Sequence, residues 1–121
     1  MDGTNYTKEE LGRILSEQRK RVGRSQGDIA KALDYSNVNF ISMIESGKSK
    51  IPINRIAVLV DAYSMSPEFI LVILRVEYPE YLDMIASIAS RFPKIFKRVT
   101  EDQDKEISNI YNYHKQLIGI D

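Results

Sequence analysis

Apolar side chains recur at helical spacing through the first half of the chain. Thr7 and Glu10 have the spacing of a capping box, and the pattern after them predicts a helix that ends at Gly23. Ser25 is placed to cap a second helix of about two turns, and a third helix, closed by Gly47, follows a polar turn. The inward positions of these three helices are Leu11, Ile14, Leu15, Gln18 and Val22, then Ile29, Ala30 and Leu33, then Ile41 and Ile44.

The second half of the chain continues the helical pattern. A fourth helix follows the basic loop at 48–52, and Ser66 and Pro67 begin a fifth, FILVILRV, which is apolar on nearly every side. Further helices are predicted after Pro79, near Pro93 and from Thr100. Their apolar positions are Ile56, Leu59, Val60 and Tyr63 in the fourth helix, Tyr81, Leu82, Ile85, Ile88, Ala89 and Phe92 after Pro79, Phe92, Ile95, Phe96 and Val99 near Pro93, and Ile107, Ile110, Tyr111, His114, Leu117 and Ile118 in the last. No alternating strand pattern competes, so the fold class is all-α with six to eight helices.

Composition narrows the chemistry that the chain can perform. Its 121 residues suit one domain, and the absence of cysteine excludes disulfides, thiolate metal sites and thiol nucleophiles. The single histidine, His114, lies on an apolar stripe, and the carboxylates are scattered, so we expect no enzyme, no metal site and no cofactor. No apolar run reaches the ~18 to 20 residues of a membrane span, and no signal peptide precedes the first helix. We therefore expect a cytoplasmic protein without a membrane partner.

Charge is distributed unevenly although the formal net charge is zero. Residues 1–55 carry 10 Lys and Arg against 7 Asp and Glu, whereas residues 56–121 carry 7 against 10. A neutral protein with a basic half can still present a local face to phosphate groups.

A short helix, a turn and a second short helix in basic surroundings form the layout of a helix-turn-helix. The stretch LGRILSEQRKRVGRSQGDIAKALDYSNVNFISMIESGKSKIP resembles the Cro/repressor-type helix-turn-helix family, also called the xenobiotic-response-element type. Asp34 and Tyr35 replace the family's usual Gly and small residue, the turn is one residue longer, and Gly27 replaces a helix-favouring residue. The resemblance covers about residues 8–74 and is carried by Leu15, Arg19, Gly23, Ser25, Gln26, Ile29, Ala30, Leu33, Ile41, Ser42, Ile44, Glu45, Gly47, Lys48 and Pro52.

The resemblance implies that the third helix reads DNA bases. Anchoring its register on Ile41 and Ser42 makes Asn37 its cap and exposes Val38, Asn39, Phe40, Ser42 and Met43. Asn39 is the best candidate, because a carboxamide bonds adenine N6 and N7 together. Phe40 fits a core position as well as it fits the DNA groove. For Asn39, the alternative to a base contact is a solvated surface residue.

Phosphate contacts and one structural ion pair are also implied. The expected phosphate contacts are Arg24, Gln26, Asn37, Lys48 and Lys50, each of which is otherwise a solvated residue or a helix-start residue. Arg19 and Glu45 are paired in the family, so we expect them to tie the first helix to the third.

The resemblance implies a lambda-repressor-like five-helix domain at residues 8–74, after a tail at 1–7 and before a C-terminal helical extension at 75–121. The predicted function is a sequence-specific transcriptional regulator, a repressor that binds double-stranded DNA as a homodimer on a palindromic operator. The dimer contacts are assigned to the stripe Ile107, Ile110, Tyr111, His114, Leu117 and Ile118, with packing inside the subunit as the alternative. Two further alternatives are an antitoxin whose C-terminal helices bind a protein toxin, and a helix-turn-helix used only for protein contacts.

Overall fold

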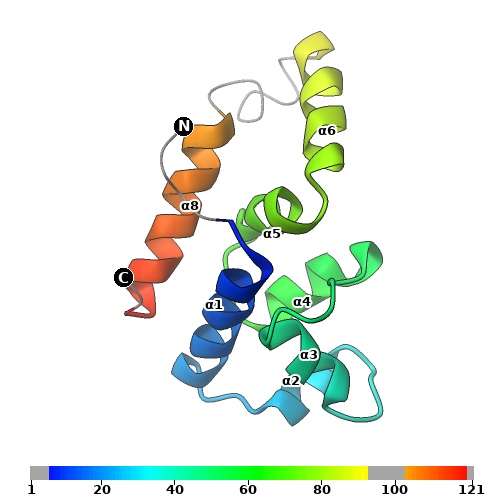
Figure 1. Ribbon diagram of the computed structural model, residues 1–121, viewed down its shortest axis with the longest axis vertical. Helices are drawn as coiled ribbons and strands as arrows, with labels where there is room; N and C mark the ends of the chain where they lie inside the picture. Colours follow the sequence, from blue (N-terminus) through cyan, green and yellow to red (C-terminus); the bar gives the residue numbers. More distant parts are fainter. Residues whose placement is uncertain (1–5, 93–102, 120–121) are drawn as a thin grey trace.

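A computed structural model of the chain describes residues 6–92 and 103–119, and Figure 1 shows its helices. The described residues form seven α-helices and one 3-10 helix, with no strand among them, which confirms the all-α prediction. The helices are α1 (Lys8–Arg21), α2 (Gln26–Ala32), α3 (Asn39–Glu45), the 3-10 helix η1 (Ile53–Arg55), α4 (Ile56–Ala62), α5 (Phe69–Glu77), α6 (Pro79–Arg91) and α8 (Gln103–Leu117). The element predicted near Pro93 lies outside the described residues.

Local caps explain where the first two helices begin. Thr7 Oγ1 accepts a hydrogen bond from the Glu10 N–H at 3.1 Å. Ser25 and Asp28 cap α2 reciprocally, each side chain accepting from the other's backbone N–H. Gly23 follows α1 with φ of 72°, a left-handed conformation that costs glycine little. The predicted starts at Thr7 and Ser25 and the stop at Gly23 are therefore confirmed.

The helix α5 lies at the centre of the core and touches α1, α4, α6 and α8. Its sequence is apolar on nearly every side because neighbours cover it from several directions. It begins at Phe69, two residues later than the predicted first helical residue Pro67, and it ends at Glu77. The largest fully buried side chains of the described core are Tyr63, Phe69, Leu11, Ile14, Leu15, Ile29, Leu33, Ile41, Ile51, Leu59, Ile73 and Ile107.

The last helix, α8, packs against α5 of its own chain, which corrects the assignment of its stripe to dimerisation. Ile107, Tyr111 and His114 are buried, and the His114 ring lies 4.8 Å from that of Phe69, between centroids. Ile110 and Ile118 pack partly against the same core, and Leu117 is 43% exposed. The reason is physical: α5 offers an apolar surface within the chain, so α8 covers it without a second copy.

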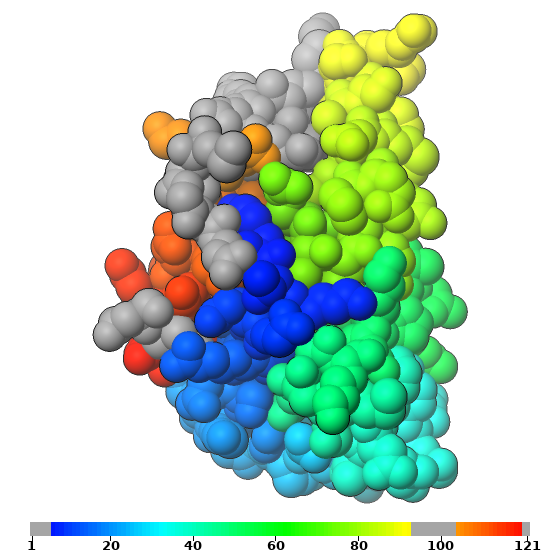
Figure 2. Space-filling model, viewed as in Figure 1, coloured from blue at the N-terminus to red at the C-terminus, as the bar shows by residue number. Residues whose placement is uncertain are grey.

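Different helices form the two ends of the molecule. In Figure 1, α2 and α3 lie at the lower end, and α6 stands at the upper end, beyond α5. Figure 2 shows the side chains of α6 forming the upper right edge of the surface. Of the stripe predicted on this helix, Leu82 and Ala89 are buried, whereas Tyr81, Ile88 and Phe92 are exposed.

Candidate nucleic-acid interface

The segment that joins α2 to α3 sets the position of α3. Tyr35 donates its backbone N–H to the Ala30 carbonyl at 2.8 Å, and Asp34 adopts φ of 62°. Aspartate enters this left-handed region more readily than most residues, which lets it stand where the family usually has glycine. α3 begins at Asn39, with Val38 as its N-cap residue.

Asn37 was predicted to be the N-cap of α3, but it lies one residue before the observed N-cap, Val38. It still helps to start the helix. Its Oδ1 accepts a hydrogen bond from the Asn39 N–H at 2.9 Å. The role predicted for its side chain is therefore kept in a shifted position, because the helix starts one residue later than expected.

One face of α3 points away from the core. Ile41 and Ile44 are buried, and the side chains of Asn39, Ser42 and Met43 are exposed on the opposite side of the helix. The register anchored on Ile41 and Ser42 is therefore the observed one. Val38, exposed at 38%, lies at the edge of this face, and Ser46, which sequence reasoning did not select, extends it.

Phe40 does not share this outward face. Its side chain is half-buried, packs partly against the core, and lies 5.2 Å from Tyr35 between ring centroids. The structure thus uses Phe40 to hold the turn, the core alternative that its sequence position allowed. Its assignment as a base contact is corrected accordingly.

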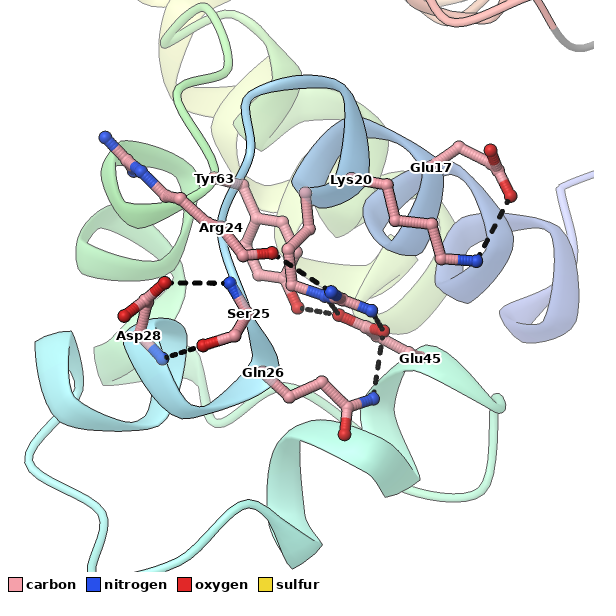
Figure 3. Close-up of polar contacts among 9 residues, drawn as sticks. Glu17, Lys20, Arg24, Ser25, Gln26, Asp28, Glu45 and Tyr63 are labelled. Carbon is pink, nitrogen blue, oxygen red and sulfur yellow. Dashed lines mark hydrogen bonds and ion pairs between the residues drawn. The ribbon is translucent and has the colours of Figure 1, made fainter.

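Beneath this surface, Glu45 accepts hydrogen bonds from three residues of three other segments (Figure 3). Arg19 donates from Nε at 2.8 Å and from Nη2 at 3.0 Å, which makes the predicted ion pair bidentate. Tyr63 donates its hydroxyl at 2.7 Å, and Gln26 donates from Nε2 at 3.2 Å. The network joins α1, α2, α3 and the end of α4 at one carboxylate, and thereby fixes α3 against the rest of the domain.

The pKa values at this carboxylate follow from its surroundings. Burial alone raises the pKa of Glu45, but the hydrogen bonds from Arg19, Tyr63 and Gln26 outweigh it and hold the pKa below its usual value. The bond to Glu45 raises the pKa of Arg19. Burial and the same carboxylate raise the pKa of Tyr63, so its hydroxyl remains a donor. At neutral pH, Arg19 and Glu45 are therefore both ionised, and Tyr63 is neutral.

The hydrogen bond from Tyr63 to Glu45 was not predicted from the sequence. The helical spacing placed Tyr63 on the inner side of the fourth helix, but it gave no reason for a hydroxyl there rather than a phenyl ring. Gln18 was likewise assigned to the apolar side, and it donates from Nε2 to the carbonyls of Tyr63 and Ser64, both at 3.0 Å. A buried polar residue among apolar positions is the signal that would have indicated such a bond.

The candidate phosphate contacts lie around α3, and they differ in whether their side chains already make hydrogen bonds within the chain. Lys48 and Lys50 are exposed on the loop that follows α3. Gln26 uses part of its carboxamide to bond Glu45. The Arg24 guanidinium donates to the Ala62 carbonyl at the end of α4, and Figure 3 shows this side chain directed away from Gln26.

The loop after α3 is held at Ile51. Glu77 Oε2 accepts from the Ile51 N–H at 3.1 Å, and Tyr78 donates its hydroxyl to the Ile51 carbonyl at 2.6 Å. The Lys50 ammonium lies 4.8 Å from the centre of the Tyr78 ring. Burial raises the pKa of Glu77, although the bond from Ile51 and the charges of Lys8 and Lys50 oppose this effect. The backbone that carries the two lysines is thus fastened to the end of α5.

The part of the chain that the structure describes contains no cluster of His, Asp and Glu suited to a metal ion. None of its helices has the length and apolar character needed to cross a membrane.

Comparison with known proteins agrees with this geometry. A helix-turn-helix family matches residues 15–70, from the middle of α1 to the first turn of α5. No curated protein and no solved structure matches the chain. The matched segment contains the whole of α2, α3 and α4, and with them the exposed face of α3 and its supporting carboxylate. Residues 15–70 therefore form a helix-turn-helix segment similar to the Cro/repressor type, and this similarity supports a DNA-binding transcription regulator.

Proposed function

We propose that the protein is a repressor that binds a palindromic operator as a homodimer, with α3 in the major groove. The observation that carries the proposal is the outward face of α3, held in place by the buried pair of Arg19 and Glu45. Asn39, Ser42 and Met43 are the proposed base contacts, with Val38 at the edge. A second copy doubles the number of base pairs read, because one helix of two turns reads few.

The phosphate contacts are assigned to the residues around this face. Lys48 and Lys50 follow its C-terminal end, Asn37 precedes it, and Arg24 and Gln26 lie at the start of α2. The three cationic residues, Arg24, Lys48 and Lys50, give six phosphate-neutralising contacts in a dimer, and the uncharged Asn37 and Gln26 add hydrogen bonds. Six such contacts predict an affinity loss of about 10³ between roughly 50 and 200 mM salt. The proposed DNA-binding unit is residues 8–74, with 75–121 as its C-terminal extension.

The test begins with selection of bound duplexes from a random pool. Asn39→Ala is expected to relax preference at one or two base pairs of each half-site, because a bidentate contact supplies about 1–3 kcal/mol of discrimination. Lys48→Ala is expected to weaken binding to all sequences about equally and to reduce the salt slope. Asn109→Ala, on the exposed side of α8, is the matched control and leaves both unchanged. Failure to enrich any duplex at low salt refutes the proposed function.

A further inference from the structure

Part of α6 is apolar yet uncovered. Leu82 lies in the core beside α5, and Ile85 packs partly against it. Another face carries large apolar side chains that water reaches. These side chains, called the α6 stripe below, are Tyr81 (37% exposed), Met84 (51%), Ile88 (45%) and Phe92 (52%). Spacings of three and four residues place Tyr81, Met84 and Ile88 along one side of the helix, and Phe92 follows as its C-cap residue.

The charges beside the α6 stripe differ at its two ends. Glu80 stands in the first turn of α6 and Arg91 in the last. They are eleven residues apart, close to three turns of ~3.6 residues, so they lie on the same edge of the stripe. Among the described residues, neither belongs to an ion pair. The stripe therefore has an acidic end and a basic end.

We propose that the α6 stripe binds the α6 stripe of a second copy, with the two helices antiparallel. This inference rests on the homodimer proposed above and assigns its interface. A two-fold axis near residue 86 sets Met84 beside the partner's Ile88 and Tyr81 beside the partner's Phe92. The same operation sets Glu80 opposite the partner's Arg91, on one edge and at one height. The dimer thus contains two pairs of opposite charge, one at each end, and the helix dipoles also oppose each other.

Antiparallel order follows from these charges. A parallel pair would set Glu80 at the height of the partner's Glu80 and Arg91 at that of the partner's Arg91. Like charges at equal heights disfavour that arrangement. The apolar side chains supply the attraction, and the charged ends select the orientation.

Sedimentation of the full-length protein without DNA tests the surface. Ile88→Glu introduces two charges near the axis and is expected to raise the dimer dissociation constant at least about a hundredfold. Ile53→Glu is the control, because Ile53 is also 45% exposed but lies in η1. Both variants should keep the circular dichroism and melting temperature of the wild type. A wild type that is monomeric at micromolar concentration, or an Ile88→Glu variant that is still dimeric, overturns the proposal.

The orientation has its own tests. Arg91→Glu is expected to weaken the dimer about tenfold, since two attractive edge pairs become repulsive, and adding Glu80→Arg restores it. Because the chain has no cysteine, a mixture of the Met84→Cys and Ile88→Cys single variants should form a mixed cross-linked dimer under oxidation. A mixture of Met84→Cys and Ser90→Cys should not, because Ser90 is turned away from the stripe. Absence of restoration or of the cross-link refutes the antiparallel pair.

These outcomes separate the interface from the proposed function. If the protein dimerises through α6 but enriches no duplex, the proposed interface stands and the proposed repressor function is refuted. If the dimer survives Ile88→Glu and still selects a palindrome, the repressor function stands and the α6 interface is refuted.

Discussion

Gly12 lies in the middle of α1, facing the C-terminal end of α3. A Cβ placed there would stand 2.3 Å from the Glu45 carbonyl oxygen and 2.8 Å from that of Ile44, where ordinary contacts begin near 3.4 Å. Both obstacles are backbone atoms, so Gly12→Ala requires α3 to move away by about 1 Å. Such overpacking costs about 1–3 kcal/mol. The movement also stretches the bonds between Arg19 and Glu45, which as charge-assisted bonds are worth about 1.5–3 kcal/mol.

Alanine returns about 1 kcal/mol through its greater helix propensity. The net effect expected for Gly12→Ala is therefore a loss of about 2–3 kcal/mol in the free energy of unfolding, or about 10 °C in melting temperature. Thermal melts followed by circular dichroism measure it. The matched control is Gly27→Ala on α2, whose added Cβ meets nothing nearer than Ser25 Oγ at 3.4 Å and should stabilise slightly. If Gly12→Ala melts at or above the wild-type temperature, the packing argument is wrong.

Substitutions at three other positions test the supports of α3 and α8. Glu45→Gln should lower the unfolding free energy by about 3 kcal/mol at pH 7 in denaturant titrations, because it leaves Arg19 unpaired. The folded pKa of Glu45 is depressed, so the wild type should lose this stability as pH falls below 4.5. The variant should show no such loss. Asp34→Val should cost about 1–2 kcal/mol in the same assay, whereas Asp34→Gly should not, because only the β-branched residue resists positive φ. Burial lowers the pKa of His114 below 6.5, so wild-type melting temperature should fall as pH drops through that value, and in His114→Phe this slope should vanish. An unchanged slope would show that another group titrates.

Local signals explain why much of the DNA-binding half was predictable. Thr7 and Ser25 cap helices through bonds to residues three positions away, so the sequence alone contains both partners. The family resemblance also supplied the pairing of Arg19 with Glu45, which lies 26 residues away and which no periodicity indicates.

The sequence predictions fail where they depend on which surface an apolar stripe packs against. The periodicity of α8 shows that Ile107 and Tyr111 share a face, but not whether that face meets α5 or a second copy. The close approach of α1 and α3 at Gly12 was equally hidden, because a glycine within a helix carries no mark of the backbone that passes it. Both features depend on the distances between elements, which helical periodicity does not report.

The position of α6 at the end opposite α3 has a consequence for operator spacing. Half the length of α6 is about 10 Å, and α5 and α4 follow it toward α3 in Figure 1, each adding ~8–10 Å. An antiparallel α6 pair therefore places its two recognition helices about 60 Å apart, nearer to two turns of duplex, ~68 Å, than to one. Inserting five base pairs between the half-sites should abolish cooperative binding, because it turns the second site to the far side of the duplex.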